Sequence, residues 1–130
     1  MSERRAIATD AAPKAVGPYS QAIVAGDFIF CAGQGPLDPA TGRLVEDDIA
    51  ACVDRTMRNI AGVLAAEGAT LDDIVKTTVF LADMADYPAV NEAYGKHFTG
   101  TPPARSAVQA AKLPLGMPIE IEAIAVRRVS

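Results

Sequence analysis

The side chains best suited to chemistry lie towards the end of the chain, where Arg105 and Glu120 interrupt apolar runs. Arg105 follows Pro102 and Pro103, and proline disfavours helix in the residue before it, so the arginine is expected at the start of a strand. Glu120 comes two residues after Pro118, near the start of a β-branched run that is typical of a strand. Each charge therefore stands where an extended segment begins.

A guanidinium and a carboxylate together suggest a site for a small anionic substrate. Arginine offers a planar fork that grips a carboxylate through two hydrogen bonds. A glutamate beside it can accept and return the proton of a reacting water. The alternative is that Arg105 and Glu120 are charges of edge strands that remain in water and discourage sheets from pairing.

The composition predicts one globular domain over residues 1–130. Half of the 130 residues are apolar, which is enough to bury a core without disulfides or a structural metal. The net charge is −4 and basic residues do not cluster, which argues against a nucleic-acid groove. Cys31 and Cys52 lie in apolar runs, and no Cys or His recurs at metal-ligand spacing, so we expect neither disulfide nor metal.

The first residues lack the apolar core of a secretory signal, and no apolar run approaches the ~20 residues of a membrane helix. A reducing cytoplasm is the compartment that this pattern favours. Strands are expected over residues 4–9, 19–25 and 28–33. The last two are joined by Gly26-Asp27, a two-residue connection typical of a β-hairpin.

Two amphipathic helices are predicted in the middle of the chain. Apolar residues recur at three- and four-residue steps over residues 48–67, with Asp47 or Asp48 available as N-cap and Gly68 as terminator. A shorter helix is expected over residues 87–98 with Asp86 as its cap. His97, at the end of this helix, is interpreted as structural.

A strand over residues 74–81 carries apolar residues on both faces, with Val75, Val79 and Leu81 expected on one face and Ile74 and Phe80 on the other. The resulting order of strand, hairpin, helix, strand, helix, strand, strand predicts an α+β fold. Two helices can cover only one face of its sheet. The apolar second face is therefore expected to meet another subunit.

Several ordered segments resemble the RidA (YjgF) family of reactive-intermediate deaminases. They are GPYSQA at 17–22, CAGQ at 31–34, Val90-Asn91, PARS at 103–106 and IEIEAIA at 119–125. The resemblance implies a chorismate-mutase-like domain with a mixed six-stranded sheet and two helices on one face. It also implies a homotrimer with sheets facing inward and sites between subunits.

The resemblance implies hydrolysis of 2-imino acids, such as 2-iminopropanoate and 2-iminobutanoate, to 2-keto acids and ammonia. Arg105 would hold the substrate carboxylate and Glu120 would direct a water at the imine carbon, while backbone near Gly33 would add hydrogen bonds and Tyr19 and Asn91 would line the pocket. A protonated imine is already electrophilic, so no metal or cofactor is implied.

One departure is Ala107, where archetypal members of the family carry a cysteine. The absence of this thiol leaves open which imine the protein prefers. The alternatives are a related enamine such as 3-aminoacrylate or 2-aminomuconate, RNA cleavage, which the charge disfavours, and a non-enzymatic carboxylate-binding or chaperone-like trimer. A purely sensing protein would not need Glu120.

The family's sheet also implies which subunits build a site. Its last strand is antiparallel to its companions, which would put Arg105 and Glu120 at opposite sheet ends, on the order of 15 to 20 Å apart in one chain. Each site is therefore expected to take Arg105 from one subunit and Glu120 from its neighbour.

Overall fold

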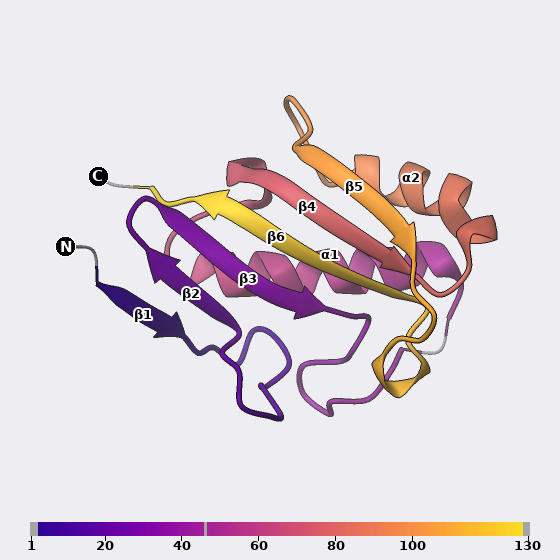
Figure 1. Ribbon diagram of the computed structural model, residues 1–130, viewed down its shortest axis with the longest axis horizontal. Helices are drawn as coiled ribbons and strands as arrows, with labels where there is room; N and C mark the ends of the chain where they lie inside the picture. The colour runs from indigo at the N-terminus through magenta and orange to yellow at the C-terminus, as the bar shows by residue number, and fades with distance from the viewer. Residues whose placement is uncertain (1–2, 46, 129–130) are drawn as a thin grey trace.

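The computed structural model describes residues 3–45 and 47–128, which form a six-stranded mixed sheet and two α-helices (Figure 1). The α+β class and the expected order of elements are confirmed. In chain order the elements are β1 (Arg4–Ile7), β2 (Ala22–Ala25), β3 (Phe28–Gln34), α1 (Ile49–Ala65), β4 (Ile74–Leu81), α2 (Tyr87–Gly95), β5 (Ala104–Gln109) and β6 (Ile119–Val126).

The strand order is β1-β2-β3-β6-β4-β5, so the last strand of the chain lies in the middle of the sheet. All neighbouring pairs are antiparallel except β4 and β5, which are parallel. In Figure 1, β6 is the yellow arrow between β3 and β4, and β5 forms an edge. The two strands that carry Glu120 and Arg105 are thus separated by β4.

Both helices lie behind the sheet in Figure 1, which confirms that they cover one face. Asp48 caps α1 by accepting a hydrogen bond from the Ala51 amide at 2.8 Å. The chain leaves the helix through Gly68, whose φ of 70° is readily adopted by glycine. The predicted apolar stripe of α1 is buried against the sheet, with no exposed surface at Val53, Met57, Ile60 and Leu64.

Several predicted boundaries were too generous. β1 ends at Ile7 rather than Thr9, α1 spans Ile49–Ala65 rather than residues 48–67, α2 ends at Gly95 rather than Phe98, and β2 begins at Ala22 rather than Tyr19. The last difference has a side-chain cause, because the buried side-chain amide of Gln21 forms hydrogen bonds with the preceding loop. Its Nε2 donates to the carbonyl oxygens of Thr9, Ala12 and Pro13, and its Oε1 accepts from the Thr9 amide.

The predicted faces of β4 were wrong at its first two residues. Ile74 is buried together with Val79 and Leu81, whereas Val75 is exposed. The register with β6 shifts between Ile74 and Lys76, which is a β-bulge. Because a bulge adds one residue to the strand, it reverses the alternation of side chains on one side of it.

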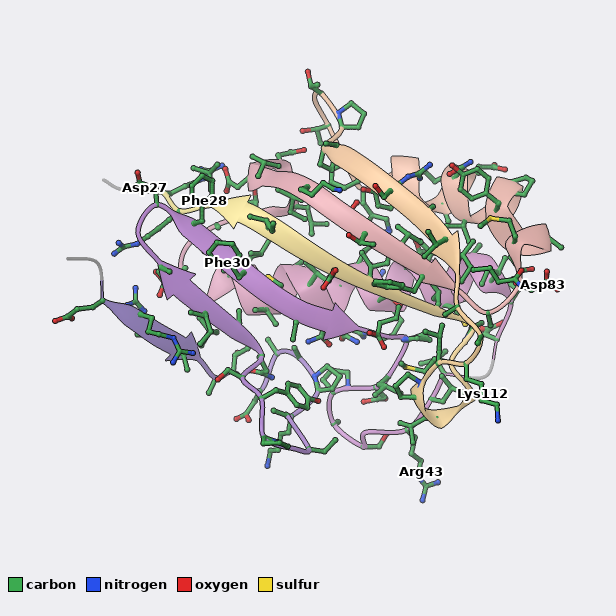
Figure 2. The ribbon with its side chains drawn as sticks, viewed as in Figure 1. Asp27, Phe28, Phe30, Arg43, Asp83 and Lys112 are labelled. Carbon is green, nitrogen blue, oxygen red and sulfur yellow. The ribbon has the colours of Figure 1, made fainter. Side chains whose placement is uncertain are left out.

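The sheet face away from the helices carries an apolar patch. Phe28 is 42% exposed, Phe30 45% and Val126 40%, and the two phenylalanine rings lie 6.3 Å apart between centroids. Figure 2 places Phe28 and Phe30 on β3, on the face turned towards the viewer. Nothing in the described chain covers this open face, as the sequence pattern had predicted.

Candidate active site

Glu120 lies on the open face of the sheet, where it meets Gly33. In β6 the buried residues Ile119 and Ile121 point to the helices, so Glu120 between them points the other way. A β-carbon added to Gly33 would lie 2.8 Å from Cδ of Glu120 and closer still to Oε1. Gly33 therefore makes the room in which this carboxyl group lies. The expected hydrogen bonds from the backbone near Gly33 to a substrate stay a prediction.

The surroundings of Glu120 favour its protonated form. Partial burial raises the pKa of the Glu120 carboxyl above its usual range, and the negative charge of Glu122 raises it further. The two glutamates lie two residues apart on the same face of β6. A carboxyl group with a raised pKa is suited to exchange protons with water near neutral pH.

Arg105 lies on the other face of the sheet, against α2. It is next to Thr77 in the parallel β4–β5 pair, and Thr77 is buried under the helices. Nη2 of Arg105 donates a 2.8 Å hydrogen bond to the hydroxyl of Tyr87. Its Cζ lies 5.4 Å from the ring centroid of Tyr87 and 5.1 Å from that of Tyr94, which is the range of cation–π contacts.

Asn91 and Ala107 belong to the same side as Arg105. Asn91 is four residues after Tyr87 and three before Tyr94, so the three share one face of α2. Its Oδ1 is buried and has no hydrogen-bond partner among the described residues, which leaves it available as an acceptor. Ala107 is two residues after Arg105 on β5 and packs against the core.

The site residues therefore form two groups on opposite faces of one chain. Glu120 pairs with Phe80 and Arg105 with Thr77, so they are only three residues apart along β4, and the expected position at opposite sheet ends is wrong. Three residues and two strand spacings correspond to about 14 Å between Cα atoms. The side chains then diverge to opposite faces, so a small molecule cannot contact both in one copy.

Tyr19 joins neither group through a contact. It lies on the loop before β2, is 51% exposed, and accepts a 3.4 Å hydrogen bond from the Val16 amide. It borders an open hollow of about 500 Å³ between this loop and β1. Within the described chain Tyr19 therefore does not line a pocket with Arg105 or Glu120. Its expected place in a pocket between subunits stays a prediction.

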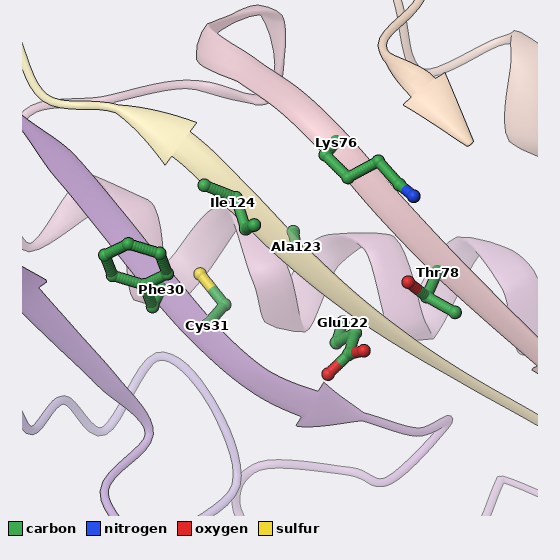
Figure 3. A pocket seen from close by; sticks show the side chains of 7 residues that line it. All are labelled: Phe30, Cys31, Lys76, Thr78, Glu122, Ala123 and Ile124. Carbon is green, nitrogen blue, oxygen red and sulfur yellow. The ribbon is translucent and has the colours of Figure 1, made fainter. Parts of the chain in front are cut away.

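The open face contains a hollow of about 180 Å³, seen from close by in Figure 3. It is lined by Phe30, Cys31, Lys76, Thr78, Glu122, Ala123 and Ile124. None of the six predicted site residues borders it, although Glu122 links it to Glu120 along β6. This hollow is open to the surface that the apolar patch would place against another subunit.

Residues 3–45 and 47–128 contain no group of three or more His, Cys, Asp or Glu side chains arranged to hold a metal ion. No helix in those ranges is long and apolar enough to cross a membrane. Both cysteines are buried, and burial raises the pKa of the Cys31 thiol to about 12, so it is inert as a nucleophile. His97 bonds Asp54 of α1 at 2.8 Å, in agreement with a structural role.

Tyr87 and Tyr94 are the functional candidates that sequence reasoning missed. Both fall on the apolar stripe of the amphipathic helix predicted over residues 87–98, and Tyr94 is indeed buried, with its hydroxyl 2.7 Å from that of Thr77. Their contact with Arg105 joins a helix to an edge strand. A hint was available, because a tyrosine on a buried stripe needs a polar partner for its hydroxyl.

Comparison with known proteins gives a family and close relatives. The family model "Endoribonuclease L-PSP" matches residues 9–127. Protein DfrA of Myxococcus xanthus is 52% identical over 125 residues and covers 95% of both chains. A mouse protein named 2-iminobutanoate/2-iminopropanoate deaminase is 46% identical over 124 residues, covering 95% of this chain and 92% of its own.

The fold is also similar to solved structures over almost its whole length. The crystal structure of yeast Mmf1 superposes with a TM-score of 0.93 at 39% identity. The match covers 97% of this chain and 100% of that one. Sequence and fold thus each match known proteins over almost the whole chain.

Proposed function

Because the chain belongs to the endoribonuclease L-PSP family, also called the YjgF/RidA family, we propose that it hydrolyses 2-imino acids to 2-keto acids and ammonia. The observation that carries the proposal is a carboxyl group of raised pKa, Glu120, held in a space that only a glycine leaves open. The name of the mouse relative supports the same reaction. 2-Iminopropanoate and 2-iminobutanoate are the proposed substrates.

Glu120 supplies the proton transfers of this reaction. As a carboxylate it takes a proton from water while the water oxygen forms a bond to the carbon of the protonated imine (C=NH₂⁺), whose C=N electron pair moves to nitrogen. The resulting tetrahedral carbon carries a hydroxyl and an amino group. Glu120 then returns the proton to the amino nitrogen, and the C–N bond breaks so that ammonia leaves with the bonding electron pair. As the keto group forms, the hydroxyl proton passes to the Glu120 carboxylate, which gives it to the departing ammonia as ammonium.

Arg105 holds the substrate carboxylate. Its guanidinium has no ion-pair partner within the described chain. Arg5, Arg127 and Arg128, by contrast, each form an ion pair with a carboxylate. A planar fork kept free of protein carboxylates and packed against aromatic rings is ready to bind an external carboxylate. Asn91, whose buried Oδ1 is a free acceptor, would face the same ligand and accept a hydrogen bond from the N–H of the protonated imine.

A complete site then needs two copies of the chain. Arg105 and Glu120 lie on opposite faces of one sheet, and the open face carries exposed phenylalanines that another copy would cover. We therefore place each site between subunits of a homotrimer, with Arg105 from one subunit and Glu120 from the next. Closed rings of identical subunits use such head-to-tail interfaces.

The charge distribution does not support RNA as the substrate. Three arginines near β1 and the end of β6 are paired with carboxylates: Arg5 and Arg127 with Glu67, and Arg128 with Asp73. A phosphate groove needs basic side chains that are free to displace counterions. Incubation with single-stranded RNA is therefore expected to leave it intact.

The direct test is to form imines from several amino acids with an amino-acid oxidase and follow their disappearance. We expect the protein to accelerate loss of the alanine- and 2-aminobutanoate-derived imines well beyond the spontaneous rate. An equal rate with and without the protein would refute the deaminase function. A trimer that binds 2-ketobutanoate yet leaves the imines untouched would favour a carboxylate-binding role.

Gly33→Ala should lower turnover about 10- to 100-fold while the protein stays folded, since a displacement near 1 Å is enough for such a loss. The new methyl group would overlap Glu120, which can rotate away at little cost in stability but then no longer directs the water. Gly100→Ala is the matched control, because a β-carbon there meets nothing within 4 Å. Wild-type turnover in Gly33→Ala would show that this position of Glu120 is not required.

A further inference from the structure

The guanidinium of Arg105 makes one hydrogen bond to protein side chains in the described chain. Of the five N–H donors of an arginine, one on Nη2 goes to the hydroxyl oxygen of Tyr87 at 2.8 Å. The remaining donors are free for a ligand. Because the tyrosine oxygen accepts this bond, its own proton points elsewhere and does not repel the guanidinium.

Two tyrosine rings restrict the tilt of the guanidinium plane. Its Cζ lies 5.4 Å from the Tyr87 centroid and 5.1 Å from the Tyr94 centroid. Tyr94 is itself immobilised, because it is buried and its hydroxyl lies 2.7 Å from that of Thr77, the residue next to Arg105 in the sheet. These contacts fix the position of the guanidinium. They do not fix its rotation within its own plane, because the attraction to the rings is the same at every such rotation.

A hydrogen bond in the plane of the fork is what selects one rotation. The Tyr87 hydroxyl provides that bond, from the first turn of α2, where Pro88 fixes the backbone next to it. A carboxylate is gripped through two parallel hydrogen bonds only when the fork is turned towards it. The orientation of Arg105 therefore depends on a single hydroxyl group of a neighbouring helix.

We propose that the Tyr87 hydroxyl is a positioning group that turns the Arg105 fork towards the substrate carboxylate and thereby sets carboxylate affinity. The proposal rests on the function proposed above and adds a residue to it. Tyr87 acts through Arg105 and takes no part in proton transfer. Its removal should therefore weaken binding of substrate and transition state alike, which raises KM and spares kcat.

The variant that isolates the hydroxyl is Tyr87→Phe, because it keeps the ring against the guanidinium. By calorimetry, 2-ketobutanoate should bind about tenfold more weakly than to wild type, as expected for one lost hydrogen bond to a charged group. With 2-iminobutanoate, KM should rise by about the same factor while kcat stays within about twofold. Arg105→Lys serves as the reference for a clamp that has lost its fork.

Thr56→Val is the matched control for loss of a hydroxyl elsewhere. The Thr56 hydroxyl is buried in α1 and donates to the Cys52 carbonyl at 2.8 Å, whereas the side-chain contacts of Arg105 are with α2. Its removal should lower the melting temperature without changing the affinity for 2-ketobutanoate. A similar change in affinity in both variants would show that Tyr87 acts only through stability.

The outcomes separate this inference from the function it rests on. If wild type neither binds 2-ketobutanoate nor consumes the imine, the deaminase function fails. If wild type and Tyr87→Phe bind equally while Arg105→Lys binds weakly, the function stands and the positioning role of Tyr87 is wrong. A loss confined to kcat in Tyr87→Phe would also overturn it, since a carboxylate clamp acts on binding.

Discussion

Replacing Glu120 by glutamine is expected to lower the turnover of 2-iminobutanoate by about three orders of magnitude, within the range of a lost general base. The amide keeps the shape of the side chain, so it still fits the space beside Gly33, but it cannot take a proton from water. Binding of 2-ketobutanoate should change little, because Arg105 grips the carboxylate. Calorimetry beside the imine assay therefore separates binding from chemistry.

The pH dependence of the wild type provides a second measurement. Glu120 must be ionised to act as a base, and burial and the charge of Glu122 raise its pKa. Turnover should thus fall on the acid side at a higher pH than an ordinary carboxyl group would give. Glu122→Gln removes the neighbouring charge, lowers the pKa of Glu120 and should move this fall to lower pH.

The same shift has a consequence for stability with a definite sign. A carboxyl group whose pKa is higher in the folded than in the unfolded state binds protons more readily when folded, so ionisation at neutral pH opposes folding. Glu120→Gln should therefore melt at a higher temperature than wild type at neutral pH. The difference should vanish as the pH falls below the unfolded pKa.

Unchanged turnover in Glu120→Gln would remove this residue from the mechanism.

The main features of the fold could be predicted because each has a local cause in the sequence. A two-residue connection at Gly26-Asp27 joins β2 to β3, Asp48 caps α1, and Gly68 with its positive φ ends the turn after it. The departures come from contacts that periodicity does not encode. Gln21 binds a distant loop instead of extending β2, and a bulge reverses the faces of β4.

The candidate site was predictable in its residue types and not in its arrangement. Arg105 and Glu120 could be identified from their places at strand starts, but the face that each occupies depends on registers with β4. The Tyr87 hydroxyl bond to Arg105 and the fit of Glu120 to Gly33 each join segments distant in sequence. Such contacts follow from the assembled sheet rather than from any single segment.

The arrangement on two faces leads to the prediction that two inactive variants restore each other. Arg105→Ala removes the clamp and Glu120→Gln removes the base, so each trimer made of one variant alone has no intact site. If a site takes Arg105 from one subunit and Glu120 from the next, a mixed trimer can combine the intact arginine of one chain with the intact glutamate of the other. Random mixing in equal amounts makes about one site in four complete.

The measurement is to unfold the two variants together, refold them, and assay the mixture with 2-iminobutanoate. Activity should rise from near zero to about a quarter of wild type, with light scattering on a size column confirming trimers and a different tag on each variant confirming mixing. The two variants refolded separately and then combined serve as control and should stay inactive. Mixed trimers without activity would mean that both groups come from one chain. That result would require Arg105 and Glu120 to reach one ligand from opposite faces of a sheet, which their registers with β4 exclude unless the strand order is different.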